Sequence, residues 1–186
     1  MPIVDYGPWM PDHADIGETP HLIDAKNVLA VSNHYGPLPG LTVTTGALTG
    51  VCRGNVAARD IDQAAHMYAG DATKLYELEG STWTDRSRAV GGAYALNTNS
   101  RWRFTPYGDR LIATNGVDAL QYIDMSTAAT TFENLPGSPP TAKFVATYLG
   151  FVFLGALGSS GMAIKWSALD DSEEWTAGVG LSDEQE

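Results

Sequence analysis

The sequence predicts an all-β, propeller-like fold, with about three four-stranded blades after a proline-rich arm. From residue 41 onward the apolar runs are short and separated by Gly, Asn, Asp and Pro, and few windows keep a helical apolar stripe for more than two turns. Three segments also repeat one order of features, namely a strand, a Gly-bearing turn, a second strand that ends in an aromatic residue, and a polar turn before another aromatic. A β-sandwich with evenly spaced hairpins is the alternative fold.

The N-terminal region differs in composition from the rest of the chain. Six of the 10 prolines fall within residues 1–39. Proline removes a backbone donor and biases the residue before it toward extended backbone, so we expect residues 1–40 to form an extended arm with turns. Residues 22–31 fit a short helix or a strand about equally well. The predicted blades then occupy residues 41–186.

The three repeats begin at His66, Arg110 and Phe151. Two stretches, 101–108 and 142–150, precede the second and third repeats as further strands, which leaves room for four strands in each unit. The repeated aromatics are about 45 residues apart, and blades of propellers are typically about 40 to 50 residues long. We expect the aromatics of the second strands to be buried. They are Tyr76, Tyr122 and Trp166, followed after the polar turns by Trp83, Phe132 and Trp175.

The turns support the repeat. Asn115-Gly116 predicts a type I′ hairpin turn, because both residue types accept positive φ angles. Gly70-Asp71 holds the corresponding place in the first repeat, and a longer loop, 158–161, does so in the third. A closed propeller usually has at least about four blades, so the three repeats predict an incomplete one.

Charge limits the classes of partner. The formal net charge is −11, which argues against a general attraction to nucleic acid. One basic cluster stands out, and the alternation in Arg101-Trp102-Arg103-Phe104 favours a solvated strand face over phosphate contact for it. The cluster consists of Arg86, Arg88, Arg101, Arg103 and Arg110.

Cys52 is the single cysteine, so the chain forms no internal disulfide and no cysteine-based zinc cluster, and we expect Cys52 to be buried. Residues 151–157 are the most apolar run and are too short to span a bilayer. No secretory signal is visible at the start, and we expect synthesis in a cytoplasm.

The sequence predicts no metal, no cofactor and no catalytic site. It contains no nucleophile elbow, zinc-protease, phosphate-loop or dinucleotide motif, and we expect no enzyme activity. A glycosidase, which needs only two carboxylates, stays open as an alternative, although no pair is singled out. Three polar clusters are better explained as loops than as metal sites. They are Asp60, Asp62 and His66; Asp12, His13 and Asp15; and Asp170, Asp171, Glu173 and Glu174.

The order of these features resembles the β-propeller tail accessory, nozzle or packaged-DNA stabilisation proteins of short-tailed phages. Four segments carry the resemblance, which covers most of the chain. They are "DAKNVLAVSNHYGPLPGLT", "AGDATKLYELEGSTWTDRSR", "WRFTPYGDRLIATNGVDALQYID" and "AIKWSALDDSEEWTAG". Chains of that family are longer, so the sequence resembles the N-terminal part of one.

That resemblance implies a structural virion protein. It implies a homo-oligomeric ring around the DNA channel of the tail, docked on a head-to-tail adaptor or other tail proteins, assembled in the host cytoplasm and helping to retain packaged DNA. DNA would pass without sequence-specific binding, and an acidic surface fits such passage. On this hypothesis four arm residues, Tyr6, Trp9, His34 and Tyr35, contact a neighbouring subunit or the adaptor, because aromatic side chains often anchor interfaces. The alternatives are a carbohydrate-binding propeller, such as a receptor-binding tail component, and a propeller glycosidase.

Overall fold

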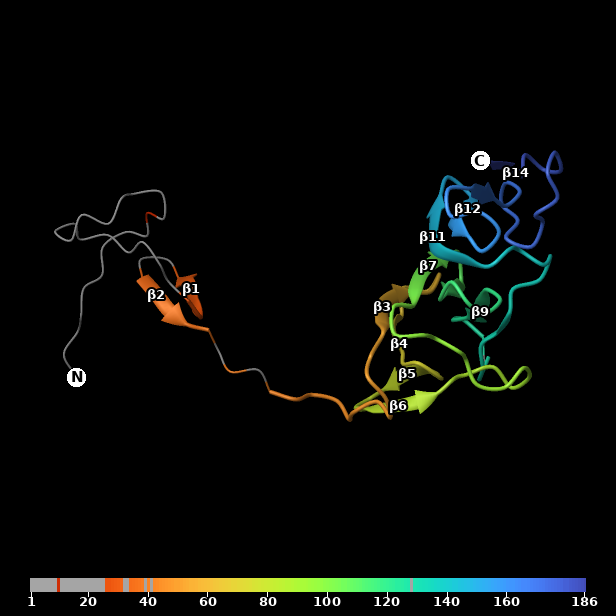
Figure 1. Cartoon of the computed structure of the whole chain (residues 1–186). Coiled ribbons are helices and arrows are strands. Elements are labelled where there is room, and N and C mark those ends of the chain that lie inside the picture. Colours follow the sequence, from red (N-terminus) through yellow and green to blue (C-terminus); the bar gives the residue numbers. More distant parts are fainter. Residues whose placement is uncertain (1–9, 11–25, 32–33, 39, 41, 128) are drawn as a thin grey trace, which may run out of the picture. The chain divides into compact units, whose positions relative to one another are not determined.

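The computed structural model describes residues 10, 26–31, 34–38, 40, 42–127 and 129–186. The chain divides into two compact units, Met1–Val43 and Thr44–Glu186, and each is described by itself. The described residues form strands and turns and no helix (Figure 1). The prediction of an all-β protein is therefore confirmed for this part of the chain.

The described part of the first unit is a two-stranded antiparallel hairpin. It pairs β1 (Val28–Val31) with β2 (His34–Pro37), in a register that runs from Val28 opposite Pro37 to Val31 opposite His34. The backbone N–H of Leu38 donates to the carbonyl of Asn27 at 2.8 Å and extends the ladder by one bond. Residues 22–31 were predicted to form either a short helix or a strand, and the structure has a strand over Val28–Val31. Residues 22–25 lie outside the described residues.

The second unit contains three four-stranded antiparallel sheets, and in each sheet every strand pairs with the next one in the chain. This confirms the prediction of three four-stranded, blade-like repeats. The first sheet contains β3 (Gly54–Arg59), β4 (Ala65–Gly70), β5 (Leu75–Glu79) and β6 (Thr82–Asp85). The second contains β7 (Arg103–Tyr107), β8 (Arg110–Thr114), β9 (Gln121–Asp124) and β10 (Glu133–Asn134). The third contains β11 (Ala142–Tyr148), β12 (Phe151–Leu157), β13 (Ile164–Trp166) and β14 (Asp183–Gln185).

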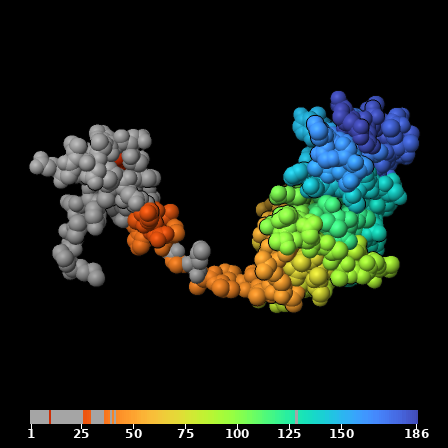
Figure 2. Space-filling view, in the orientation of Figure 1, coloured from red at the N-terminus to blue at the C-terminus, as the bar shows by residue number. Residues whose placement is uncertain are grey.

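The first strands of the three sheets, β3, β7 and β11, lie side by side, and we call them the inner strands. The middle one, β7, contacts both β3 and β11 (Figure 1). The hydroxyl of Thr105 on β7 donates to that of Thr147 on β11 at 3.0 Å. Figure 2 shows the three sheets following one another in sequence order over the surface of this unit. First strands gathered along one line are typical of propeller blades arranged about an axis.

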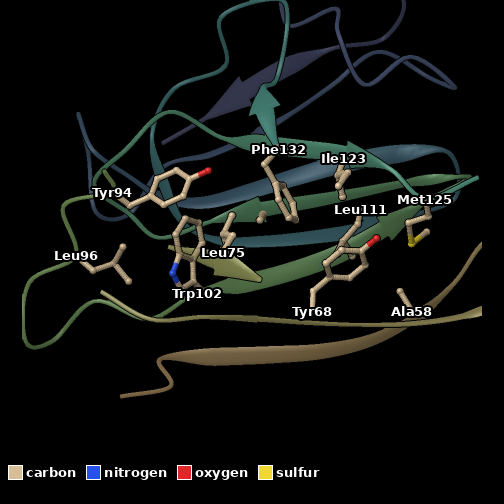
Figure 3. Close-up of a cluster of buried hydrophobic side chains, with 11 residues drawn as sticks. Ala58, Tyr68, Leu75, Tyr94, Leu96, Trp102, Leu111, Ile123, Met125 and Phe132 are labelled. Atoms are coloured by element: carbon tan, nitrogen blue, oxygen red, sulfur yellow. The ribbon is translucent and has the colours of Figure 1, made fainter. Parts of the chain in front are cut away.

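Two hydrophobic clusters hold the row of sheets together, one on each face of the second sheet. Successive side chains of a strand point to opposite faces. Leu111 and Ala113 of β8 therefore pack toward the first sheet, while Ile112 packs toward the third, and all three are fully buried. Burial on both faces explains why residues 111–113 of β8 are all apolar. The first cluster, drawn in Figure 3, contains Ala58, Tyr68, Leu75, Tyr94, Leu96, Trp102, Leu111, Ala113, Ile123, Met125 and Phe132.

The predicted type I′ turn at Asn115-Gly116 is wrong. Gly116 has a φ of 79°, but Asn115 does not lie in the left-handed region, and the connection from β8 to β9 spans residues 115–120. The Asn115 side-chain oxygen instead accepts the backbone N–H groups of Val117 and Asp118, at 2.9 and 2.8 Å. Asp71 does the same in the first sheet for Thr73 and Lys74, so the repeated element is a side-chain-capped turn.

The expected burial of the repeated aromatics holds for Tyr76, while Tyr122 and Trp166 are only half-buried. Trp166 lies on the outer face of the third sheet, where strand register puts it opposite Phe153. The described residues place no further sheet against this face, which is why its side chains keep solvent contact. We define the outer face of the third sheet by Tyr148, Phe151, Phe153, Ile164 and Trp166.

Candidate functional site

The five arginines expected to share a solvated strand face separate into two groups. Arg86, Arg88 and Arg110 each pair with carboxylates, so that expectation is wrong for them. Arg101 and Arg103 are exposed and have no carboxylate partner among the described residues, while Trp102 between them is buried. The ion pairs join Arg86 to Glu77 and Glu79, Arg88 to Asp118, and Arg110 to Asp124 and Glu173.

Arg101 and Arg103 line an open pocket of about 550 Å³ at the beginning of the inner strands β7 and β11. Lys143, the second residue of β11, brings a third positive charge to it. The other lining residues are neutral, and none is a carboxylate. They are Asn97, Thr98, Asn99, Ser100, Asn115, Gly116, Val117 and Phe144.

The loop on one side of this pocket is held by local hydrogen bonds. The side-chain oxygen of Asn97 accepts the backbone N–H groups of Asn99 and Ser100, at 2.9 and 3.0 Å. Arg53 approaches from the first sheet, where its Nη1 donates to the carbonyls of Asn97 and Thr98, at 2.8 and 3.1 Å. The Arg53 Nε is buried and has no hydrogen-bond partner among the described residues. The polar wall of the pocket is therefore positioned before any ligand binds.

The opposite side is formed by the capped turn at Asn115 and by Lys143. Gly116 lies so close to the Lys143 side chain that a Cβ on Gly116 would stand 2.9 Å from the Lys143 Cγ. The Arg103 guanidinium carbon lies 5.8 Å from the centre of the Phe144 ring, within the range of a cation–π contact. Lys143 thus lies beside Gly116 and the Arg103 guanidinium beside the Phe144 ring, while both cations stay exposed. The arrangement can attract and orient an anionic group.

Asp60, Asp62 and His66 were first weighed as a metal site. Asp60 and His66 instead form an ion-pair network with Glu77, and Asp62 has no part in it. The Nδ1 of His66 lies 2.9 Å from Glu77 Oε1, and its Nε2 lies 3.4 Å from Asp60 Oδ2. Burial lowers the pKa of His66, but the hydrogen bonds and charges of Glu77 and Asp60 outweigh this, so that its pKa is raised above 6.5. Among the described residues no group of three or more His, Cys, Asp and Glu side chains is placed to hold a metal ion.

This network predicts a pH-dependent loss of stability. A group whose pKa is raised by folding stabilises the fold fully below its unfolded pKa, about 6.5 for histidine, and that contribution is lost as the pH rises through the folded value. We expect the free energy of unfolding of the wild type to fall from pH 6 to pH 8 more than that of His66→Gln. Urea denaturation at several pH values measures the difference, and equal slopes for the two proteins would contradict it.

The remaining expected sites are placed as follows. The cluster Asp12, His13 and Asp15 lies outside the described residues. The acidic cluster at 170–174 forms the loop between β13 and β14, as expected of a turn, where the Asp171 carboxylate accepts the N–H of Glu173 at 2.8 Å. In the predicted arm interface, Tyr6 and Trp9 lie outside the described residues, while His34 and Tyr35 belong to β2.

The expected burial of Cys52 is wrong, because this side chain is exposed. Its neighbour Arg53 is fixed by two backbone bonds, since its N–H donates to Gly70 and its carbonyl accepts from Trp102, at 2.7 and 3.0 Å. Arg53 then reaches toward the loop at Asn97, and adjacent residues of an extended chain point in opposite directions. Cys52 is consequently turned to solvent.

Sequence reasoning missed Lys143 and Asn97 as parts of the pocket, and Arg53 as a residue that fixes its wall. Arg53 and Lys143 had a weak local signal, because both occur near the start of an inner strand, as Arg103 does. A scan against protein-family profiles and a search of curated proteins both find no match for the chain. The described residues include no helix with the length and apolarity that crossing a membrane requires.

Proposed function

We propose that the chain is a structural protein of a phage tail, forming part of a ring around the DNA channel and helping to retain packaged DNA. The observation that carries this proposal is the row of three blade-like sheets with their first strands aligned along one line. Propellers and propeller-containing rings are built from such sheets around an axis. The sequence resemblance to tail accessory proteins supplies the biological setting.

The outer face of the third sheet supports association with further copies. Phe151, Phe153 and Trp166 follow one another across it, with ring centres 6.0 and 6.1 Å apart, and Tyr148 is 66% exposed. Contiguous apolar and aromatic residues on a surface mark sites of protein association. In the proposed ring, neighbouring subunits cover this face, and the head-to-tail adaptor or other tail proteins contact the arm.

Labelling of phage particles tests the proposal. Particles purified from a lysate of the encoding strain are stained with gold-conjugated antibodies against the chain and imaged by electron microscopy. We expect gold at the tail vertex, and we expect the protein among the virion components identified by mass spectrometry. Protein found only in the particle-free lysate would refute the proposal.

Truncation tests the role of the arm in the same particles. Removal of residues 1–36 is expected to leave the second unit folded, because that unit has its own hydrophobic clusters, but to prevent incorporation of the chain into particles. Normal incorporation of the truncated chain would show that Tyr6, Trp9, His34 and Tyr35 are not needed for assembly.

A further inference from the structure

The three cations of the pocket have no carboxylate partner among the described residues, whereas five other cations of the second unit form ion pairs. The chain has 22 acidic and 11 basic residues, so carboxylates outnumber the Lys and Arg cations two to one. The five paired cations are Arg86, Arg88, Arg110, Lys74 and Lys165. Among the other described cations of this unit, Arg53 and Arg59 donate to backbone carbonyls instead. Arg101, Arg103 and Lys143 also have no carboxylate partner among the described residues, and these three line one pocket.

We propose that this pocket binds a phosphate group. Three positive charges without a lining carboxylate match a group that carries up to two negative charges and several acceptor oxygens. The planar guanidinium group of Arg103 offers paired N–H donors, and the Lys143 ammonium adds a compact charge. Arg101 brings the third charge, with its Nη1 already donating to the carbonyls of Thr98 and Ser100 at 2.9 and 2.8 Å. The side-chain amide of Asn99 and the hydroxyl of Ser100 supply neutral polar groups at the same wall, whereas the amide of Asn115 is used within its own turn.

The size of the pocket and the hydrogen bonds that hold its walls in place are suited to a bound ligand. Its volume of about 550 Å³ lies within the range of about 300 to 1,000 Å³ that ligand sites occupy. Asn97 caps the loop on one side and Asn115 caps the turn on the other, so little ordering accompanies binding. Phe144 adds an exposed aromatic ring beside Arg103. The inference depends only on these residues and stands without the virion proposal.

Titration calorimetry of the full chain at low ionic strength tests the inference with three probes: inorganic phosphate, a nucleoside monophosphate and a short single-stranded oligothymidylate. The pocket variant is Arg103→Gln with Lys143→Gln, since both side chains are exposed and their loss should leave the fold intact. Because two of the three positive charges are lost, we expect the variant to bind at least about tenfold more weakly. Circular dichroism verifies that both proteins are folded.

A matched control removes two cations elsewhere. Arg59→Gln with Lys74→Gln changes the net charge equally and touches no pocket residue, so its affinity for the three probes should equal that of the wild type. Acetate serves as the carboxylate probe and should bind more weakly than phosphate. The proposal is overturned if the wild type binds none of the three phosphate probes, if acetate binds as tightly as phosphate, or if the control variant loses as much affinity as the pocket variant.

The probes also distinguish the source of the phosphate. Binding of phosphate and the nucleotide without binding of the oligonucleotide identifies a small-molecule site. Binding of the oligonucleotide identifies a strand backbone, and log K should then fall with log salt concentration by a slope of about 0.7 for the one phosphate that the pocket holds. Both outcomes support phosphate as the recognised group.

Discussion

Gly137→Ala should lower the free energy of unfolding by about 3 kcal/mol or more, because overpacking costs about 1 to 3 kcal/mol and a left-handed alanine about 1 to 2 kcal/mol. Gly137 lies in the link between the second and third sheets and has a φ of 75°. A Cβ there would stand 1.6 Å from the backbone carbonyl oxygen of Glu173, and 3.0 Å from the Trp175 ring. A backbone atom cannot turn aside as a flexible side chain can, so the link must move away from the loop at 172–175. Urea denaturation followed by tryptophan fluorescence measures the loss.

Gly178→Ala is the matched control for this substitution. Gly178 has a similar φ of 83°, but no atom lies within 4 Å of the position of its Cβ. This variant therefore reports the backbone strain alone, about 1 to 2 kcal/mol. If both alanine variants lose the same stability, the close approach of Gly137 to Glu173 contributes nothing and the prediction fails.

Trp102→Ala should lower the free energy of unfolding by about 3 to 5 kcal/mol, the usual cost of truncating a buried tryptophan. Trp102 is 2% exposed and fills the space between the first and second sheets, beside Leu75 and Tyr94 (Figure 3). Its ring meets that of Tyr94 edge-on, with centres 4.9 Å apart, and its indole N–H donates to the Asp71 carbonyl at 2.9 Å. The truncation removes both the packing and the hydrogen bond, and chemical denaturation followed by circular dichroism measures the total.

Two further variants separate these contributions. Trp102→Phe keeps much of the ring but leaves the Asp71 carbonyl without its donor, so about 1 to 3 kcal/mol of loss is expected from the bond. Trp83→Ala removes a half-buried tryptophan from β6 and should cost less than Trp102→Ala. A loss as large for Trp83 as for Trp102 would contradict the assignment of Trp102 to the centre of the cluster.

The strand layout was predictable because it depends on local signals. The pairs β4–β5, β8–β9 and β12–β13 are neighbours in the chain, and short apolar runs bounded by polar turns identify them without knowledge of the rest. The turn at Asn115 was assigned the wrong type, because the sequence does not reveal that its side-chain oxygen, and not a positive φ, closes the connection.

The candidate site was less predictable because its parts come from separate sheets. Arg103 and Lys143 are near in space only because β7 and β11 lie side by side, and that contact depends on how whole sheets pack. Adjacency in the sequence grouped Arg101 and Arg103 with Arg86, Arg88 and Arg110. The carboxylates that neutralise the latter three come from β5, from the turn after β8, from the end of β9 and from the loop between β13 and β14, which no local pattern indicates.

The row of sheets has a consequence for cooperativity. Each sheet is closed by its own local hairpins, and the two hydrophobic clusters join only neighbouring sheets. Such an architecture follows nearest-neighbour energetics, in which the stability of the whole is a sum of unit and interface contributions. The second sheet takes part in both interfaces, so it is the unit whose unfolding uncouples the other two, whereas loss of an end sheet leaves one interface intact.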